Sequence, residues 1–592
     1  MTEAQSRSWR RLLGPAILCF AALIATAPQI VRGNTCGHDF DFHLVSWFDA
    51  LQNWHQGIVY PHWSPNSNFG AGEPRFIFYP PISWMLGAAF GAILRWNVAP
   101  LALTALFLAL TGLATRALAR RLMSEGPATL AGCAAIFSGY ALFTAYERSD
   151  FGELTGGFWV PLILLLALRE RNSATTLVRR AFDGSTALLA LAIAGAWLSN
   201  APLGVMTCYL LAGVALLLAL LRRSWAPIVR SSTAVVLGLG ITTFYWLPAL
   251  VEQRWADMSQ ILNDPGYTIE NNWLFARHAD PALALHDAEL LKASFIAVTM
   301  LAVTLIGLFL CWRRGKMRGQ SDWWLPLAAI PIVVLLLQLP LSDFVWNTLP
   351  NLRFLQFPWR WLVVLQAPMG IFFAAAVWMN RKLRRTVVVS GSIALFLAAT
   401  LVAGFNFFQT CDDEDAVWAM VDTYRTGAGF VGTDEYEPPY ADNTQLAANL
   451  PFACFTTSPT TSLGQGSAGG DLEWSADQHS CEATFSSAPT LGLPPAEHLR
   501  VNATAAHSGA LILRLRNYPA WQVRLNGILQ TSLPHRNDGL IAIPVSQGSI
   551  TVTADWATTS DVRLSRWISL LALALLIATL FVERKPSAAH LS

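Results

Sequence analysis

The chain has 592 residues, of which 54% are hydrophobic and only 13% are charged, and its net charge is +2. A soluble domain carries about 25% charged residues, so this composition excludes an ordinary water-soluble globule and predicts a protein that crosses a membrane many times. The small net charge also argues against nucleic acid as a partner.

Apolar segments of spanning length recur along the chain. A transmembrane helix needs about 20 apolar residues. About twelve such helices are expected, at 12–31, 98–119, 127–146, 154–168, 185–199, 203–221, 231–250, 291–312, 323–339, 359–378, 386–404 and 564–582. The first could be a cleaved signal peptide, but its apolar run from Leu12 to Val31 is long enough to span, which favours a retained helix.

Short clusters of basic residues between these segments predict the orientation. They all fall on one side of the membrane if the apolar segment 81–95 lies in the interface without crossing. Basic loops remain in the cytoplasm, so we expect both termini there. The long polar segments, 32–97 and 405–563, then lie on the outer face.

The predicted organisation has three parts. Residues 1–404 are expected to form a transmembrane domain, in which the first outer loop, 32–97, carries interfacial helices. Residues 405–563 are expected to form an extracytoplasmic β-rich domain, and residues 564–592 the last helix with a short cytoplasmic tail.

The β-rich prediction rests on strand and turn patterns. The segments ALILRLRN, YPAWQVRLNG, GLIAIPVSQG and SITVTADW alternate in polarity and are separated by Asn-Gly, Asp-Gly and Gln-Gly. This pattern is typical of the hairpins of a β-sandwich. Among the cysteines predicted on the outer face, Cys454 and Cys481 are the favoured disulfide pair.

The first outer loop begins with the sequence HDFDFH, which contains Asp39, Asp41 and His43. A carboxylate at a low-dielectric boundary can deprotonate a hydroxyl or bind a divalent cation. In a helix that starts here, Asp39 and His43 share a face. The alternative is that Asp39 caps the helix and Asp41 is solvated. The functional interpretation is favoured.

A second acidic sequence, ERSDFGE, follows the third expected span and contains Arg148, Asp150 and Glu153. Charged residues at the end of an apolar helix are costly unless they are paired or face a water-filled cleft. We expect either a second acidic point that faces the first loop or an ordinary exposed loop with one salt bridge.

Arginines beside aromatic residues occur at two further outer boundaries. Arg75 lies in EPRFIFYPP, and Arg353, Trp359 and Arg360 lie in LRFLQFPWRW. Arginine binds phosphate in a bidentate way and aromatic faces stack on sugars, so a phosphate and sugar platform is expected. The alternative is an aromatic belt with snorkelling arginines. The acidic segment 431–439 is expected to be a solvated loop, with a lid over the first loop as the alternative.

Taken together, these motifs resemble the GT-C superfamily of polytopic glycosyltransferases. The resemblance rests on GHDFDFH, YPHW and FIFYPP in the first outer loop. RSDFGEL, LSNAP, RFLQFPWRW, GTDEYEPP and NYPAWQVRLNG are similar to a bacterial subgroup labelled as membrane proteins related to 6-pyruvoyl-tetrahydropterin synthase. The resemblance covers roughly residues 30–580.

The resemblance implies an enzyme of the bacterial inner membrane with its large loops in the periplasm. The enzyme would take a sugar from a polyprenyl-phosphate donor and pass it to a cell-envelope glycan, lipid or protein. It implies Asp39 as the catalytic carboxylate that deprotonates or orients the acceptor hydroxyl, with Asp41 as second choice, and Asp150 and Glu153 as ligands of a divalent cation such as Mg²⁺ or Mn²⁺. The expected substrate-binding residues are His43, Arg75, Arg148, Arg353, Trp359 and Arg360.

Two other functions remain open. The chain could be a non-catalytic envelope protein whose β-rich domain binds glycan. A transporter is less favoured, because the charged residues lie at helix ends and not in the middle of spans.

Overall fold

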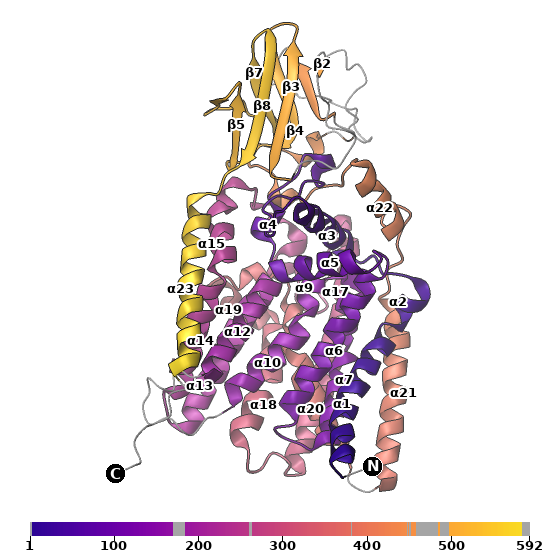
Figure 1. The fold of residues 1–592 in the computed structure, drawn as a ribbon. Helices are drawn as coiled ribbons and strands as arrows, with labels where there is room; N and C mark the ends of the chain where they lie inside the picture. Colours follow the sequence, from indigo (N-terminus) through magenta and orange to yellow (C-terminus); the bar gives the residue numbers. More distant parts are fainter. Residues whose placement is uncertain are drawn as a thin grey trace, which may run out of the picture.

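The computed structural model is a bundle of long helices with a β-sheet module at one end (Figure 1). It describes residues 3–169, 184–259, 263–379, 382–446, 448, 451–456, 484–485 and 496–582. The long helices are α1 (Glu3–Ala25), α6 (Ala99–Ala119), α7 (Glu125–Ile136), α10 (Gly156–Leu168), α12 (Gly184–Ser199), α13 (Ala201–Arg222), α14 (Ala226–Ile241), α17 (Ala284–Arg313), α18 (Ser321–Leu337), α20 (Leu362–Val377), α21 (Lys382–Asn406) and α23 (Ser560–Val582).

These helices have the length and composition of membrane spans. Within the described residues, 8 helices are long and apolar enough to cross a membrane, or up to 10 if two bent pairs each count as one span. Leu12–Ala25 and Gly184–Ser199 are shorter apolar helices in segments that the sequence predicted as spans. The polytopic helical fold is confirmed, and the number of about twelve stays a prediction.

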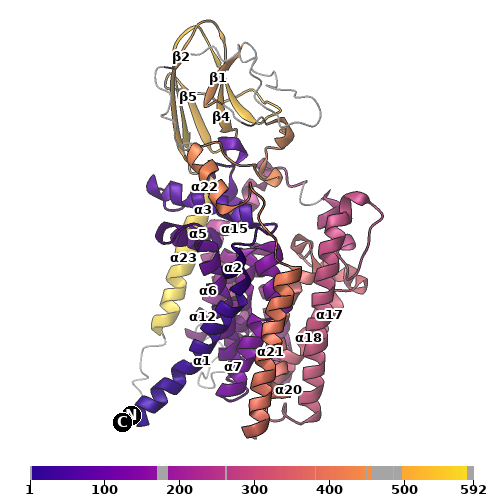
Figure 2. The ribbon, with the colours of Figure 1, turned by 90° about the vertical axis from the view of Figure 1, so that its right-hand side faces the viewer.

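The outermost helices turn apolar side chains away from the protein. Only 28% of the most apolar window of α21 is buried, although its mean hydropathy is 2.2, and α23 is also 28% buried. In a polytopic membrane protein such surfaces face lipid, which is as apolar as the side chains themselves. Helices α17, α18 and α20 pack together on another side of the bundle (Figure 2).

The centre of the bundle is packed closely through small residues. A Cβ added at Gly132 of α7 would lie 2.5 Å from the Gly112 carbonyl oxygen of α6, and one added at Gly370 of α20 would lie 2.4 Å from that of Ala131. Small residues let helix backbones approach in membrane proteins. The contacts fix α7, whose C-terminal extension carries the site described below.

Shorter helices cover the end of the bundle that faces the sheets. Helices α3 and α5 cross the direction of the long helices (Figure 1), so the placement of α5 agrees with the prediction that 81–95 does not span. The short helices are α2 (Ala27–Arg32), α3 (Phe40–His55), α4 (Arg75–Phe78), α5 (Pro81–Ile93), α8 (Gly139–Phe143), α9 (Phe151–Leu154), α15 (Thr243–Glu252), α19 (Asp343–Thr348) and α22 (Val417–Thr426).

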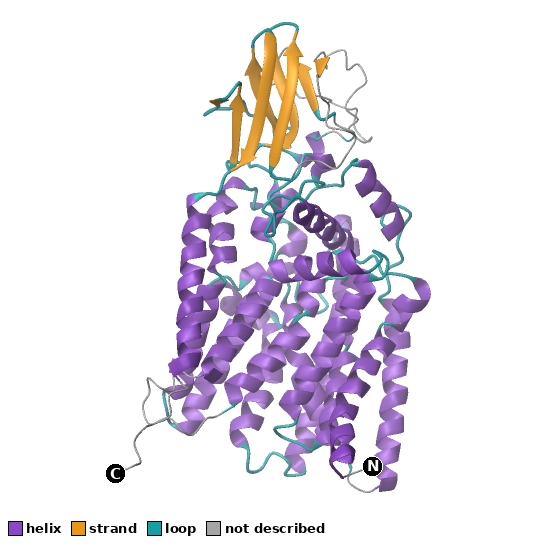
Figure 3. Ribbon diagram, viewed as in Figure 1, coloured by secondary structure: helices purple, strands orange, loops and turns teal. Residues whose placement is uncertain are grey.

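The β-sheet module contains two antiparallel sheets in the described residues (Figure 3). One has the order β1-β4-β7 and the other β2-β3-β8-β5-β6. The strands are β1 (Ala453–Thr456), β2 (Thr484–Phe485), β3 (His498–Ala505), β4 (Gly509–Arg516), β5 (Trp521–Leu525), β6 (Ile528–Leu529), β7 (Leu540–Val545) and β8 (Gly548–Trp556). Asn526 and Gly527, with φ values of 49° and 84°, form the tight turn between β5 and β6. The predicted strands are confirmed, and so is the hairpin at Asn526-Gly527; the strands on either side of Gln547-Gly548, β7 and β8, lie in different sheets, so the hairpin predicted there is wrong.

The module rests on the first outer loop through aromatic packing. Trp63 of that loop is buried against Tyr518, Trp521 and Trp556, with ring centroids 6.2, 5.3 and 5.5 Å away. Burial of large aromatic side chains contributes strongly to such contacts. The module and the loop therefore form one continuous structure above the helices.

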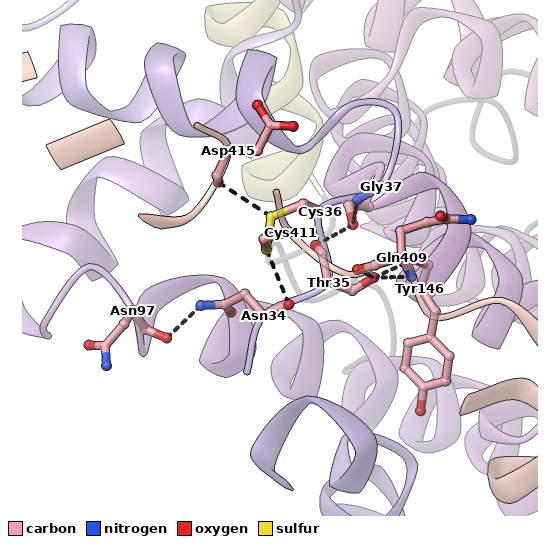
Figure 4. Close-up of a disulfide and its surroundings, with 10 residues drawn as sticks. Asn34, Thr35, Cys36, Gly37, Asn97, Tyr146, Gln409, Cys411 and Asp415 are labelled. Atoms are coloured by element: carbon pink, nitrogen blue, oxygen red, sulfur yellow. Dashed lines mark hydrogen bonds between the residues drawn. A yellow bond between two sulfur atoms is a disulfide. The ribbon is translucent and has the colours of Figure 1, made fainter. Parts of the chain in front are cut away.

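A disulfide joins the start of the first loop to the segment after α21 (Figure 4). It links Cys36 to Cys411, 375 residues apart in sequence. Beside it, the Thr35 hydroxyl donates to the Tyr146 carbonyl oxygen at 2.6 Å, and the Gln409 backbone N–H donates to that hydroxyl at 3.1 Å. The sequence did not predict this pair.

The disulfide favoured from the sequence was Cys454–Cys481. Cys454 is disulfide-bonded, and Cys481 lies outside the described residues.

Candidate functional site

The site is organised by a break in the helix that continues from α7 and α8. Thr144–Arg148 forms a single π-helical turn, Ser149 has a left-handed φ of 53°, and Asp150 caps the next helix, α9, by accepting from the Glu153 N–H at 2.8 Å. π-turns of this kind occur at functional sites. The break leaves backbone carbonyl oxygens free to bind another segment.

The start of the first outer loop binds to those carbonyl oxygens. The backbone N–H of His38 donates to the Glu147 oxygen at 3.3 Å, and that of Asp39 donates to the Arg148 oxygen at 2.9 Å. Gly37 permits this approach, since a Cβ there would lie 2.3 Å from the Glu147 oxygen. The two acidic sequences are thus held against each other, as one of the sequence-based interpretations expected.

Arg148 lies at the centre of the joined segments. Its Nη2 lies 3.0 Å from Asp39 Oδ2 and 3.9 Å from Asp150 Oδ2, and its Nη1 lies 3.2 Å from Glu153 Oε2. Only 7% of its side chain is exposed, and its guanidinium lies 5.2 Å from the ring centroid of Trp359. Three carboxylates therefore share one buried cation, a geometry in which charge pairing is essential.

Glu153 is the most enclosed of the three carboxylates, with 1% of its side chain exposed. It also lies 3.5 Å from Arg360 Nε and accepts a hydrogen bond from the Tyr140 hydroxyl. Two cations and a phenol already surround this carboxylate. The predicted role of Glu153 as a metal ligand is therefore not supported.

Asp150 is held by His43 from the opposite side. His43 Nε2 lies 3.6 Å from Asp150 Oδ1, and the Tyr79 hydroxyl lies 3.5 Å from the same imidazole nitrogen. Burial opposes ionisation of Asp150, but the hydrogen bond with His43 and the charge of Arg148 lower its pKa below the usual value. His43, predicted as substrate-binding, is itself fully buried and contacts Asp150.

These groups form part of the wall of a polar cavity of about 820 Å³. Predicted residues on its wall are Asp39, Arg148, Asp150 and Arg360. The sequence analysis did not single out Glu147, His286, Glu289, Lys292 and Glu435, which also line it. The predicted Trp359 lies just behind the wall, buried and in contact with Arg148.

Three predicted residues lie away from this cavity. Asp41 is exposed and is not on the wall. Arg75 is buried off the wall, where its Nε lies 2.6 Å from Glu73 Oε1. Arg353 lies at the surface, 2.8 Å from Glu270. The wall of this cavity therefore does not include Asp41, predicted as catalytic, or Arg75 and Arg353, predicted as phosphate-binding.

A metal centre is not apparent at the site. Within the described parts of the chain, no group of three or more His, Cys, Asp or Glu side chains is arranged to hold a metal ion. Asp150 and Glu153 are instead engaged by His43, Arg148 and Arg360. The carboxylates here are organised by cations of the protein itself.

A second, apolar groove of about 500 Å³ lies between α7, α8, α17, α20 and α21. Its wall includes Phe295, Met300, Phe373 and Phe396. Among the residues that the structure describes, Lys292 of α17 is the only one that lines both this groove and the polar cavity. Its ammonium lies 2.6 Å from Glu147 Oε1, so a cation stands where an apolar channel among spanning helices meets the polar site.

Comparison with known proteins places the chain in a described family. The model of a family described as "6-pyruvoyl-tetrahydropterin synthase related domain; membrane protein" matches residues 76–410. This range covers more than half of the chain. No curated protein sequence matches the chain.

Several solved structures are similar at low identity. The oligosaccharyltransferase AglB of Archaeoglobus fulgidus, in complex with an inhibitory peptide and a dolichol-phosphate, aligns at 12% identity with a TM-score of 0.44, over 76% of this chain and 62% of that one. The chain thus spans about three fifths of the length of that enzyme. ArnT of Cupriavidus metallidurans, bound to undecaprenyl phosphate, aligns at 14% identity with a TM-score of 0.39, over 77% and 83%.

The mycobacterial arabinofuranosyltransferase AftD aligns at 18% identity with a TM-score of 0.41, over 67% of this chain and 27% of that one. All three TM-scores lie below 0.5, so these similarities do not assign an activity to the chain.

Proposed function

The chain belongs to the family of membrane proteins described as 6-pyruvoyl-tetrahydropterin synthase related, and we propose that it is a GT-C-type membrane glycosyltransferase. In this proposal it transfers a sugar from a polyprenyl-phosphate donor to a hydroxyl of a cell-envelope acceptor on the outer face of the bacterial inner membrane. Both termini are then cytoplasmic. In this proposal residues 1–404 form the transmembrane domain and residues 405–563 the extracytoplasmic β-rich domain. Residues 564–592 form the last helix with a short cytoplasmic tail.

The observation that carries the proposal is the position of Lys292. A polyprenyl-phosphate sugar joins a long apolar chain to an anionic phosphate and a polar sugar. The groove beside Phe295 and Phe373 could hold the polyprenyl chain, and Lys292 could bind the phosphate at the boundary. The 820 Å³ cavity could then hold the sugar and the acceptor. A water-soluble donor has no apolar chain that could bind in a groove that meets the polar cavity at Lys292.

Cations of the cavity wall would hold the donor phosphate. Lys292 and Arg360 both line the cavity. The Arg360 Nη1 donates to the Leu355 carbonyl oxygen at 2.9 Å and to Gln356 Oε1 at 3.1 Å, which fixes the guanidinium before substrate arrives. A preorganised cation stabilises negative charge as it develops on the leaving phosphate.

Asp39 is the proposed general base. It lines the cavity, 34% of its side chain is exposed, and its backbone and side chain are both anchored to Arg148. Its carboxylate would accept the proton of the acceptor hydroxyl while the acceptor oxygen bonds to the anomeric carbon. The bond from that carbon to the phosphate oxygen breaks, and polyprenyl phosphate leaves beside Lys292.

The test is sugar transfer in proteoliposomes from a panel of radiolabelled polyprenyl-phosphate sugars. Wild type should form product and Asp39→Asn should not. Asp41→Asn is the matched control, because Asp41 is two residues away but exposed and off the cavity wall. Equal transfer by wild type and Asp39→Asn would remove Asp39 from the mechanism, and no transfer by wild type from any donor would refute the function.

A further inference from the structure

The acidic segment around residue 435 is a fixed wall of the cavity and not a solvated loop. The Phe430 backbone exchanges hydrogen bonds with the first outer loop, and the Thr433 N–H donates to Glu73 Oε2 at 2.8 Å. Tyr436 stacks on Phe78 with ring centroids 5.3 Å apart. These contacts are distributed along the segment, so they place Glu435 on the cavity wall.

Glu435 differs from the other carboxyl groups on that wall in its partners. Each of the others lies beside a basic side chain, in the pairs Asp39–Arg148 at 3.0 Å, Glu147–Lys292 at 2.6 Å, Asp150–His43 at 3.6 Å and Glu289–His38 at 3.4 Å. Among the residues that the structure describes, no basic side chain forms an ion pair with Glu435. A carboxyl group that is half-buried without a cation favours its neutral form.

The charged surroundings of Glu435 act in the same direction. Burial is the largest effect, and the negative charges of Glu73 and Asp39 add to it. The hydrogen bond with Tyr436 and the charge of Arg75 oppose these effects, and the result raises the pKa of Glu435 to about 7. Tyr267, which also lines the cavity, interacts electrostatically with Glu435 as well. At neutral pH the group is therefore present in part as a carboxylic acid, which can donate a hydrogen bond.

We propose that Glu435 is a substrate-contacting residue that binds an oxygen atom of the donor sugar in its carboxylic acid form. This inference rests on the proposed function. A neutral acid offers both a donor and an acceptor to sugar hydroxyls. It also adds no negative charge to a cavity that must admit an anionic phosphate, whereas an ionised Glu435 beside Asp39 would repel the donor.

The pH dependence follows from this assignment. If only the neutral form binds donor, the apparent dissociation constant is the intrinsic one divided by the neutral fraction. That fraction falls from about 0.9 at pH 6 to about 0.1 at pH 8 for a group that titrates near 7. Donor affinity of wild type should therefore weaken about tenfold between pH 6 and pH 8.

The experiment measures binding and transfer with the full chain in nanodiscs, with decaprenyl phosphate and a panel of decaprenyl-phosphate-linked sugars as probes. Glu435→Gln stays neutral at every pH, so its affinity for the sugar-linked lipid should stay flat from pH 6 to pH 8. Glu435→Ala should weaken binding of the sugar-linked lipid but not of decaprenyl phosphate. Asp434→Asn is the matched control, because Asp434 is exposed, lies off the cavity wall and accepts from Asn443 Nδ2 at 2.7 Å.

The outcomes separate this inference from the proposed function. If wild type transfers sugar but Glu435→Gln keeps the wild-type pH dependence, Glu435 is not a sugar contact and the transferase stands. If wild type binds no sugar-linked lipid more tightly than decaprenyl phosphate, the inference is overturned by binding alone. If wild type neither binds nor transfers any probe, both proposals fall. Melting temperatures of the variants within the range of Asp434→Asn show that the fold is intact.

Discussion

Replacing Arg148 should destabilise the protein more than replacing any surface arginine. Arg148 is the shared partner of three carboxylates, with Asp39 at 3.0 Å, Glu153 at 3.2 Å and Asp150 at 3.9 Å. In Arg148→Gln, Glu153 would keep only one cation, Arg360, at 3.5 Å. Removing one partner of a buried ion pair costs about 3–5 kcal/mol, because the remaining charge is left uncompensated. Equilibrium unfolding in mixed micelles, followed by tryptophan fluorescence, measures this cost.

The control is Arg353→Gln. The Arg353 and Glu270 side chains are 46% and 48% exposed, although they lie only 2.8 Å apart, and such surface pairs contribute about 0–1 kcal/mol. The double variant Arg148→Gln, Glu153→Gln should recover part of the loss, since it also removes the most deeply buried of these three carboxylates. A loss for Arg148→Gln no larger than that for Arg353→Gln, or a double variant that is simply additive, would refute the reasoning.

Three further predictions concern the site and its anchors. Asp39→Asn should lower sugar transfer by at least about 10²-fold, the usual contribution of a general base, and Asp41→Asn should not; radiolabelled product measures both. Lys292→Met should weaken binding of polyprenyl phosphate about tenfold or more, as expected for loss of a charged hydrogen bond; native mass spectrometry measures the affinity, and wild-type affinity in the variant would exclude Lys292 as the phosphate site. Cys36→Ser with Cys411→Ser should lower the free energy of unfolding by about 2–5 kcal/mol; reductant should destabilise wild type by more than the double variant, in which the disulfide of Cys454 remains, and an equal effect on both would count against the Cys36–Cys411 pair.

Parts of the fold that depend on local sequence could be predicted. The LSNAP sequence is an example, because Asn200 caps α13 by accepting from the Leu203 N–H at 2.9 Å and Pro202 stands in the first turn. The bends within candidate spans could not be predicted in the same way. Ala226–Ile241 and Thr243–Trp255 meet at 70°, and Ser321–Leu337 and Pro340–Thr348 at 97°. Those angles depend on neighbouring helices.

The candidate site was predictable where a motif is short and contiguous. Asp39 was singled out as a carboxylate at a low-dielectric boundary, and Arg148 because charge at the end of an apolar helix is costly without a partner. Lys292 was missed because it is one cation at the start of a long apolar helix, and its meaning depends on which cavities meet there. The burial of Arg75 off the cavity wall had a signal in the sequence, since Glu73 stands two residues earlier and supplies its counter-charge.

A general base and an anionic donor have opposite electrostatic requirements, and the pattern of ion pairs resolves this conflict. Within the described part of the chain, five carboxyl groups line the cavity, at Asp39, Glu147, Asp150, Glu289 and Glu435. If all five carboxyl groups were ionised and unpaired, their negative charges would repel a phosphate, because charges interact strongly in a low-dielectric site. Four lie beside basic side chains, and the fifth has a raised pKa. The only one of these pairs that also borders the apolar groove is Glu147–Lys292, so it is the pair that an arriving lipid phosphate would meet first.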